Sequence, residues 1–164
     1  MPDLPESSFH IRAATPEDIP AVFDLVRKLA EYERLTHIVS ATPHDFHQAL
    51  FGARPAAEAL LAFLDRRAVG LALYFSNFST FLGRSWLYLE DIFVEPEHRG
   101  QGIGKAFFRR LAQIGVERGC GRIEWNVLTW NQPSIEFYER LGAERLEEWR
   151  TYRLAGDALQ KAAG

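Results

Sequence analysis

The stretch Arg99-Gly100-Gln101-Gly102-Ile103-Gly104-Lys105 stands between an apolar strand pattern and an amphipathic helix pattern. The strand is expected over Trp86–Val94, and the helix over Ile103–Glu117, where apolar residues recur at helical spacing. A turn of this kind exposes the unpaired N–H groups of the helix start, which attract anions together with the helix dipole. Glycines also let the backbone approach a phosphate closely and adopt positive φ. The stretch therefore predicts a pyrophosphate site, and a bare structural turn is the alternative.

The spacing of the three glycines in this turn excludes two familiar nucleotide motifs. Gly104 comes one residue too early for the dinucleotide fingerprint G-x-G-x-x-G. A P-loop needs four residues between its first glycine and its Gly-Lys pair, and this turn lacks them. A plain nucleotide-binding module is therefore the weakest interpretation of the glycines.

Outward from the turn, the chain consists of further strand and helix patterns. Strands are expected over Phe9–Ala13, Ala59–Leu64, Ala68–Phe75, Trp86–Val94, Arg122–Leu128 and Arg145–Leu154. Helices are expected to start at Thr15, Thr42, Ile103 and Pro133. They are expected to end between Tyr32 and Leu35 and near Gly52, Glu117 and Leu141. The predicted fold class is α+β, a central mixed sheet flanked by helices in the order β-α-α-β-β-β-α-β-α-β. Within it, the strand–helix–strand unit from Trp86 to Leu128 should be parallel.

Length and composition indicate one folded domain over residues 1–164. Hydrophobic residues make up 47% and charged residues 25%, which is the balance of a globular chain. The net charge of −3 argues against a nucleic-acid binder with a general basic surface. The single Cys120 excludes an internal disulfide framework, no apolar run approaches a membrane span, and Met1–His10 lacks a secretory signal pattern. We therefore expect a cytoplasmic protein without membrane or nucleic-acid partners.

Several motifs together resemble one enzyme superfamily. Arg99-x-x-Gly102-x-Gly104 matches the acetyl-CoA signature of the GCN5-related N-acetyltransferase (GNAT) superfamily, after an acidic strand and at the head of a helix. The predicted element order also resembles the GNAT fold. The segments Leu29–Glu33, Leu87–Val94 and Trp130–Tyr138 are similar to those of the diamine (spermidine/spermine) and thialysine N-acetyltransferases. The resemblance implies direct transfer from acetyl-CoA to a primary amine of a polyamine, diamine or lysine-like amino acid, without a metal, by a homodimer.

The same resemblance implies two sets of binding residues. Those for the cofactor are Ile92, Phe93, Val94, Arg99, Gly100, Gln101, Gly102, Ile103, Gly104, Lys105, Asn131, Pro133, Ser134 and Tyr138. Those for the amine are Tyr32, Glu33, Glu90, Glu124, Trp125, Asn126 and Glu148. For each of the latter, a solvated charge or a packing aromatic is the alternative.

Two residues are implied to be catalytic. An alkylammonium has a pKa of about 10.4, so the acceptor must lose a proton before it attacks a thioester. Neighbouring strand residues should point to opposite faces, and the family pattern selects Glu90 rather than Asp91 to assist, directly or through water. A backbone N–H near Ile92 is implied to stabilise the oxyanion. Tyr138 is implied to protonate the leaving thiolate, and a packing tyrosine is the alternative.

Two other functions fit the same fold. The acceptor could be a protein lysine or N-terminus, or the chain could be a non-catalytic acyl-CoA-binding sensor. The presence of both Glu90 and Tyr138 disfavours the sensor, because a binding module needs neither. Cys120 has no neighbouring histidine and is interpreted as an inert small hydrophobe rather than an acyl-carrying nucleophile.

Overall fold

The computed structural model describes residues 9–164, so most of the Met1–His10 segment lies outside the described residues. Its strands are β1 (Phe9–Ala13), β2 (Glu58–Leu64), β3 (Arg67–Ser79), β4 (Arg84–Val94) and β5 (Ile123–Glu124). Its helices are α1 (Ile19–Tyr32), α2 (Pro43–Phe51), α3 (Ile103–Glu117), α4 (Gln132–Arg140) and α5 (Gly156–Ala163). Short 3₁₀ turns form η1 (Pro16–Asp18), η2 (Thr36–Ile38) and η3 (Pro96–His98).

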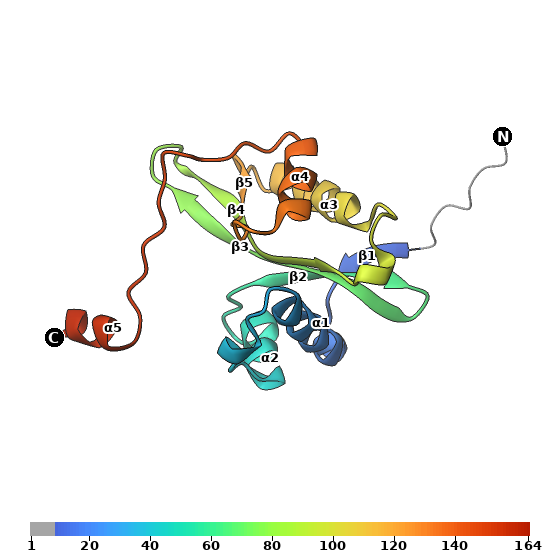
Figure 1. Cartoon of the computed structure of the whole chain (residues 1–164), viewed down its shortest axis with the longest axis horizontal. Coiled ribbons are helices and arrows are strands. Elements are labelled where there is room, and N and C mark those ends of the chain that lie inside the picture. Colours follow the sequence, from blue (N-terminus) through green and yellow to red (C-terminus); the bar gives the residue numbers. More distant parts are fainter. Residues whose placement is uncertain (1–8) are drawn as a thin grey trace. The chain divides into compact units, whose positions relative to one another are not determined.

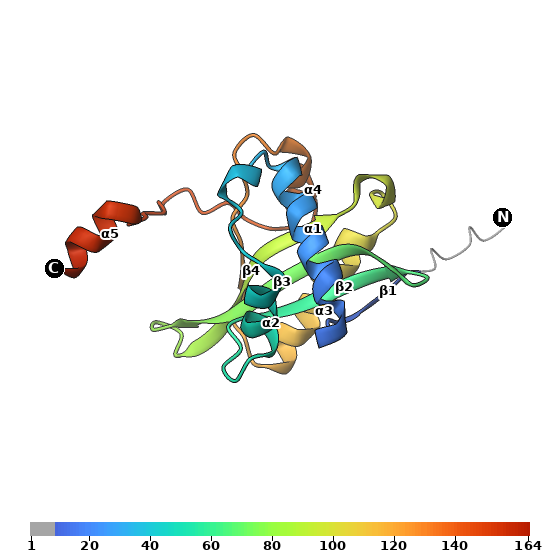
Figure 2. The same ribbon diagram turned by 90° about the horizontal axis from the view of Figure 1, so that it is seen from below.

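The five strands form one mixed sheet in the order β1-β2-β3-β4-β5. The first four pair antiparallel, and β5 pairs parallel with β4, which confirms the parallel strand–helix–strand unit. Helices α1 and α2 lie on one face of the sheet and α3 on the other (Figure 1). Seen from the α1 face, α1 crosses β2 and β3 (Figure 2). The glycine turn thus leads from β4 into a helix that covers the opposite face from α1.

Each face of the sheet carries its own apolar core. The face under α1 and α2 buries Val22, Leu25, Leu61, Leu71 and Phe93, among others. The face under α3 buries Leu87, Leu89, Ile103, Phe107 and Leu111, among others. The helical spacing of the α3 residues follows from packing one side of the helix on the sheet.

Phe107 is the largest fully buried side chain of the described residues, with an exposed fraction of 0%. Phe107→Ala removes a ring from the centre of this core. We expect it to lower the free energy of unfolding, measured in urea, by about 3–5 kcal/mol. Val116 on the same helix is 80% exposed, so Val116→Ala should change stability by less than about 0.5 kcal/mol. Equal effects of the two substitutions would contradict this assignment of the core.

The end of the chain differs from its predicted structure. The strand predicted over Arg145–Leu154 is wrong: this stretch is irregular, exposed chain, followed by the unpredicted helix α5. The strand predicted over Arg122–Leu128 shortens to the two residues of β5. A strand needs a hydrogen-bonded partner for its backbone N–H and C=O groups, and the sheet of the described residues contains only β1 to β5.

The chain consists of two compact units, and the boundary between them along the sequence lies between Leu128 and Thr129. The first contains the sheet with α1, α2 and α3, and the second contains α4 and α5. A single functional domain over residues 1–164 stays a prediction. Within residues 9–164, no helix combines the length and apolar character needed to cross a membrane.

Candidate active site

The glycine turn has the backbone geometry of an open anion cradle. Gly100 has φ of 76° and Gly102, the N-cap of α3, has φ of 87°, a region that favours glycine. A Cβ added to either residue would meet no other atom within 4 Å, so the space above the turn is open. The first N–H groups of α3 have no intrahelical partner and face this end of the helix. The turn therefore fits a pyrophosphate.

Arg99, the first residue of the turn, contacts both β4 and α1. Its Nε donates a 2.9 Å hydrogen bond to the carbonyl oxygen of Val94. Its guanidinium lies 4.6 Å from the ring centroid of Tyr32 and 5.6 Å from that of Phe93. The turn is thereby connected to the carboxyl end of α1, where Tyr32 and Glu33 lie.

The other predicted cofactor residues of the first unit differ in how far their side chains are buried. Phe93 and Ile103 are buried in the two cores, so only their backbones are available to a ligand. Gln101 and Lys105 are exposed beside the turn, and Ile92 and Val94 lie partly buried in β4.

A bulge in β4 changes which side chains share a face. Leu73 pairs with Asp91 and Tyr74 pairs with Leu89, so Glu90 is an extra residue on this strand. Leu89 and Ile92 both pack against the α3-side core, which places Glu90 and Asp91 together on the α1 side. The expectation that these two side chains point to opposite faces is therefore wrong. Leu87 and Leu89 have the even spacing of residues on one strand face, but the step from Leu89 to Ile92 is odd. This odd step was the sequence signal of the bulge.

Glu33, Glu90 and Asp91 form what we call the acidic cluster. Burial raises the pKa of Asp91 to about 7, and the negative charges of Glu90 and Glu33 add to the effect. Burial also raises the pKa of Glu33. Glu90 is exposed, so the cluster is open to water at one side. Such a site favours a cation and contains a carboxyl group that exchanges its proton near neutral pH.

Residues of β4 and β5 border the acidic cluster. Burial raises the pKa of Tyr88, with Glu90 as the next cause. The Asn126 side chain donates a 2.9 Å hydrogen bond to the Tyr88 hydroxyl, and Glu124 pairs with Tyr88 in register and with Arg122 as an ion pair. Trp125 packs against Phe108 of α3, with ring centroids 4.9 Å apart, so the structure does not bring it to this face.

The remaining predicted site residues lie in the second unit. Asn131 is buried and is the N-cap of α4, whose second residue is Pro133. Ser134 and Tyr138 are partly buried on α4, and the Tyr138 ring lies 5.6 Å from that of Phe137. Glu148 lies in exposed irregular chain.

The comparisons with known proteins agree with this geometry. The model of the Acetyltransferase (GNAT) family matches residues 21–143, most of the chain. The chain belongs to the GNAT acetyltransferase family. Members of this family use acetyl-CoA as the acyl donor, which fits the open glycine turn. The predicted superfamily and fold class are confirmed.

Similar proteins place this GNAT enzyme among N-acetyltransferases. It is 36% identical to the thialysine N-epsilon-acetyltransferase of Bos taurus, over 94% of this chain and 96% of the relative. It is 34% identical to the L-ornithine N5-acetyltransferase of Arabidopsis thaliana, over 92% of this chain and 86% of the relative. An integron cassette protein from V. cholerae has a similar structure, with a TM-score of 0.80 and 25% identity, covering 95% of this chain and 98% of its own.

Among the described residues of this GNAT enzyme, Glu95, Glu97 and His98 could bring ligand atoms together around a metal ion. However, the Glu95 carboxylate already binds two cations, Lys28 and Arg67. Because those ion pairs occupy its oxygens, the group offers little to a metal. These residues lie outside the predicted catalytic and binding sets.

Proposed function

We propose that this enzyme transfers an acetyl group from acetyl-CoA to a primary amine of a small cationic acceptor, such as an ornithine-like or lysine-like amino acid, a diamine or a polyamine. The acidic cluster is the observation that carries this proposal. Its carboxyl groups attract an ammonium group beside the strand that leads into the glycine turn. The named activities of the thialysine and ornithine relatives support the same acceptor class.

Within the acidic cluster, we assign different roles to Asp91 and Glu90. A general base works best when its pKa is near the working pH, and Asp91 meets this condition with a pKa of about 7. Asp91 therefore accepts the ammonium proton, directly or through one water molecule. Glu90, which is exposed, and Glu33 hold the positive charge of the arriving acceptor. Glu90, which the family pattern selects, is the competing candidate for the base.

The other assignments follow the predicted site residues. Arg99 to Lys105 hold the pyrophosphate, and Asn131, Pro133 and Ser134 contact the CoA arm. The backbone of Ile92, Phe93 and Val94 lies along the donor, and a backbone N–H near Ile92 donates to the developing oxyanion. The amine forms a C–N bond with the acetyl carbon, the C–S bond breaks, and Tyr138 gives its proton to the departing sulfur.

We further propose a cytoplasmic homodimer. Large apolar side chains that a monomer would expose support the dimer: Phe81, at the tip of the β3–β4 hairpin, is 97% exposed, and Trp149 and Tyr152 are also exposed. Size-exclusion chromatography with light scattering would measure the mass directly, and a mass of one chain would refute this part.

Free thiol release from acetyl-CoA tests the proposed function. We expect the wild-type enzyme to turn over ornithine, lysine-like amino acids or diamines with kcat/KM at least tenfold above that for lysine-containing peptides (about 1.4 kcal/mol). Faster turnover of peptides would favour the protein acetyltransferase alternative. Tight CoA binding without turnover of any amine would favour the sensor.

A further inference from the structure

Glu95 is a buried carboxylate at the point where the chain leaves β4. Its side chain is 2% exposed, yet it lies outside the acidic cluster. Lys28 Nζ of α1 lies 2.6 Å from one carboxylate oxygen, and an Arg67 terminal nitrogen of β3 lies 2.5 Å from the other. The two cations come from different elements, so Glu95 connects α1, β3 and β4 at one point.

The two cations stabilise the buried negative charge of Glu95. Burial raises the pKa of Glu95, but the hydrogen bonds from Lys28 and Arg67 outweigh it and lower the pKa overall. The carboxylate is therefore charged at neutral pH. Removing one partner of a buried pair leaves an uncompensated charge, so both cations keep Glu95 in place. Its backbone N–H also donates a 2.9 Å hydrogen bond to the carbonyl oxygen of Val69.

A short, hydrogen-bonded path joins Glu95 to the glycine turn. The N–H of His98 donates to the Glu95 carbonyl at 2.9 Å, and the N–H of Arg99 donates to the Pro96 carbonyl at 3.3 Å. These bonds form η3, which occupies the residues between the buried carboxylate and Arg99. A shift of Glu95 would therefore move the first residue of the turn.

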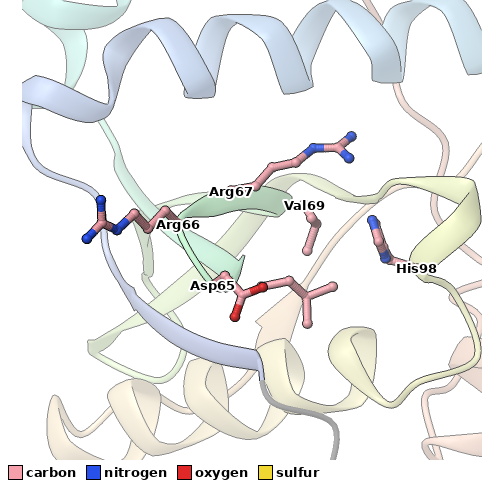
Figure 3. A pocket seen from close by; sticks show the side chains of 6 residues that line it. Asp65, Arg66, Arg67, Val69 and His98 are labelled. Atoms are coloured by element: carbon pink, nitrogen blue, oxygen red, sulfur yellow. The ribbon is translucent and has the colours of Figure 1, made fainter.

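His98 completes the surroundings of the carboxylate. Its Nε2 lies 3.8 Å from a Glu95 oxygen, and this buried atom has no hydrogen-bond partner within residues 9–164. It lines an open cavity of about 550 Å³ with Asp65, Arg66, Arg67, Val69 and Leu64. Figure 3 shows His98 beside Val69, and Arg67 extending toward α1. Arg67 is 59% exposed, so it can be substituted without opening a core.

We propose that Glu95 is a positioning residue for the cofactor turn. Clamped by Lys28 and Arg67, it sets the start of η3 and thereby the direction in which the Arg99–Lys105 N–H groups face the pyrophosphate. The proposal rests on the proposed function only in taking CoA as the ligand of this turn. It assigns a role to a residue that touches neither the acetyl group nor the amine.

The test compares Glu95→Gln with Arg67→Gln and with a matched control, Glu58→Gln. Glu58 is also a strand carboxylate that binds an arginine, Arg118, at 2.6 and 2.7 Å. It is the first residue of β2, at the end of that strand away from the turn into Arg67. For Glu95→Gln we expect the Kd of CoA by calorimetry and the KM of acetyl-CoA to rise about tenfold. Both kcat and the KM of the amine should stay within about twofold. Arg67→Gln should raise the Kd about threefold, and Glu58→Gln should leave it unchanged.

Hydrogen exchange of the free enzyme gives a readout that needs no ligand. Amides of residues 97–104 should exchange at least about fivefold faster in Glu95→Gln, and Glu58→Gln should leave them unchanged. Unchanged exchange there and an unchanged Kd would overturn the positioning role. Should Glu95→Gln fail to fold, Arg67→Gln decides by the same two measurements. If exchange were faster in Glu95→Gln while the wild-type enzyme bound no CoA, the result would refute the proposed function and not the positioning role.

Discussion

Asp91→Asn is expected to lower kcat/KM for the amine by about 10²–10³, because it removes the group that accepts the ammonium proton. The acceptor arrives charged, and an amide cannot take its proton. The Asp91 carboxyl has a pKa of about 7 through burial and the neighbouring charges of Glu90 and Glu33. The wild-type pH–rate profile should therefore rise through about pH 7, and the variant should lack this limb.

The same substitution should stabilise the fold at alkaline pH. The pKa of Asp91 is raised from 3.8 to about 7, so the folded chain holds more protons than the unfolded chain between these pH values. Stability therefore falls as the pH rises through this window. Asp91→Asn removes that loss, and we expect a Tm gain of about 2–4 °C at pH 8 but almost none at pH 4. A Tm of Asp91→Asn below that of the wild type at pH 8 would contradict the raised pKa of the Asp91 carboxyl group.

Glu90→Gln separates the two possible bases. It removes a negative charge that raises the pKa of Asp91, so the rising limb of the pH profile should move to lower pH. We expect its main effect on the KM of the amine, with a loss of kcat below about tenfold. If instead Glu90→Gln lost more than Asp91→Asn, the base would be Glu90, as the family pattern selects.

Tyr138→Phe is expected to reduce kcat by about 10², because the departing CoA thiolate loses its proton donor. The substitution deletes only the hydroxyl and keeps the ring, which packs beside Phe137 on α4. The Kd of CoA should therefore stay within about twofold of the wild type. Thiol release under saturating acetyl-CoA measures kcat, and calorimetry measures the Kd.

Tyr152→Phe is the matched control for this experiment. Tyr152 is a tyrosine of the same unit, but it is 90% exposed in irregular chain. Loss of its hydroxyl should leave kcat unchanged. Full activity of Tyr138→Phe would remove Tyr138 from the mechanism, and equal losses in the two variants would point to a general effect of the second unit.

The local elements of this enzyme could be predicted because their signals lie in neighbouring residues. Thr42 begins α2 as expected, with its hydroxyl oxygen accepting the Asp45 N–H at 3.3 Å. Gly102 has the positive φ that the turn requires. The predicted strand Arg145–Leu154 failed for the opposite reason, since strand formation depends on a partner from elsewhere in the chain.

The sequence by itself determined the family, the order of the elements before Arg145, and the glycine turn at the head of α3. Only the tertiary structure decided which carboxyl group has a pKa near 7 and which one anchors the turn. A bulge in β4 turns Asp91 to the side of Glu33, and the packing of α1 and β3 brings Lys28 and Arg67 to Glu95. Desolvation and charge depend on groups far apart in the sequence, so composition and spacing do not encode them locally.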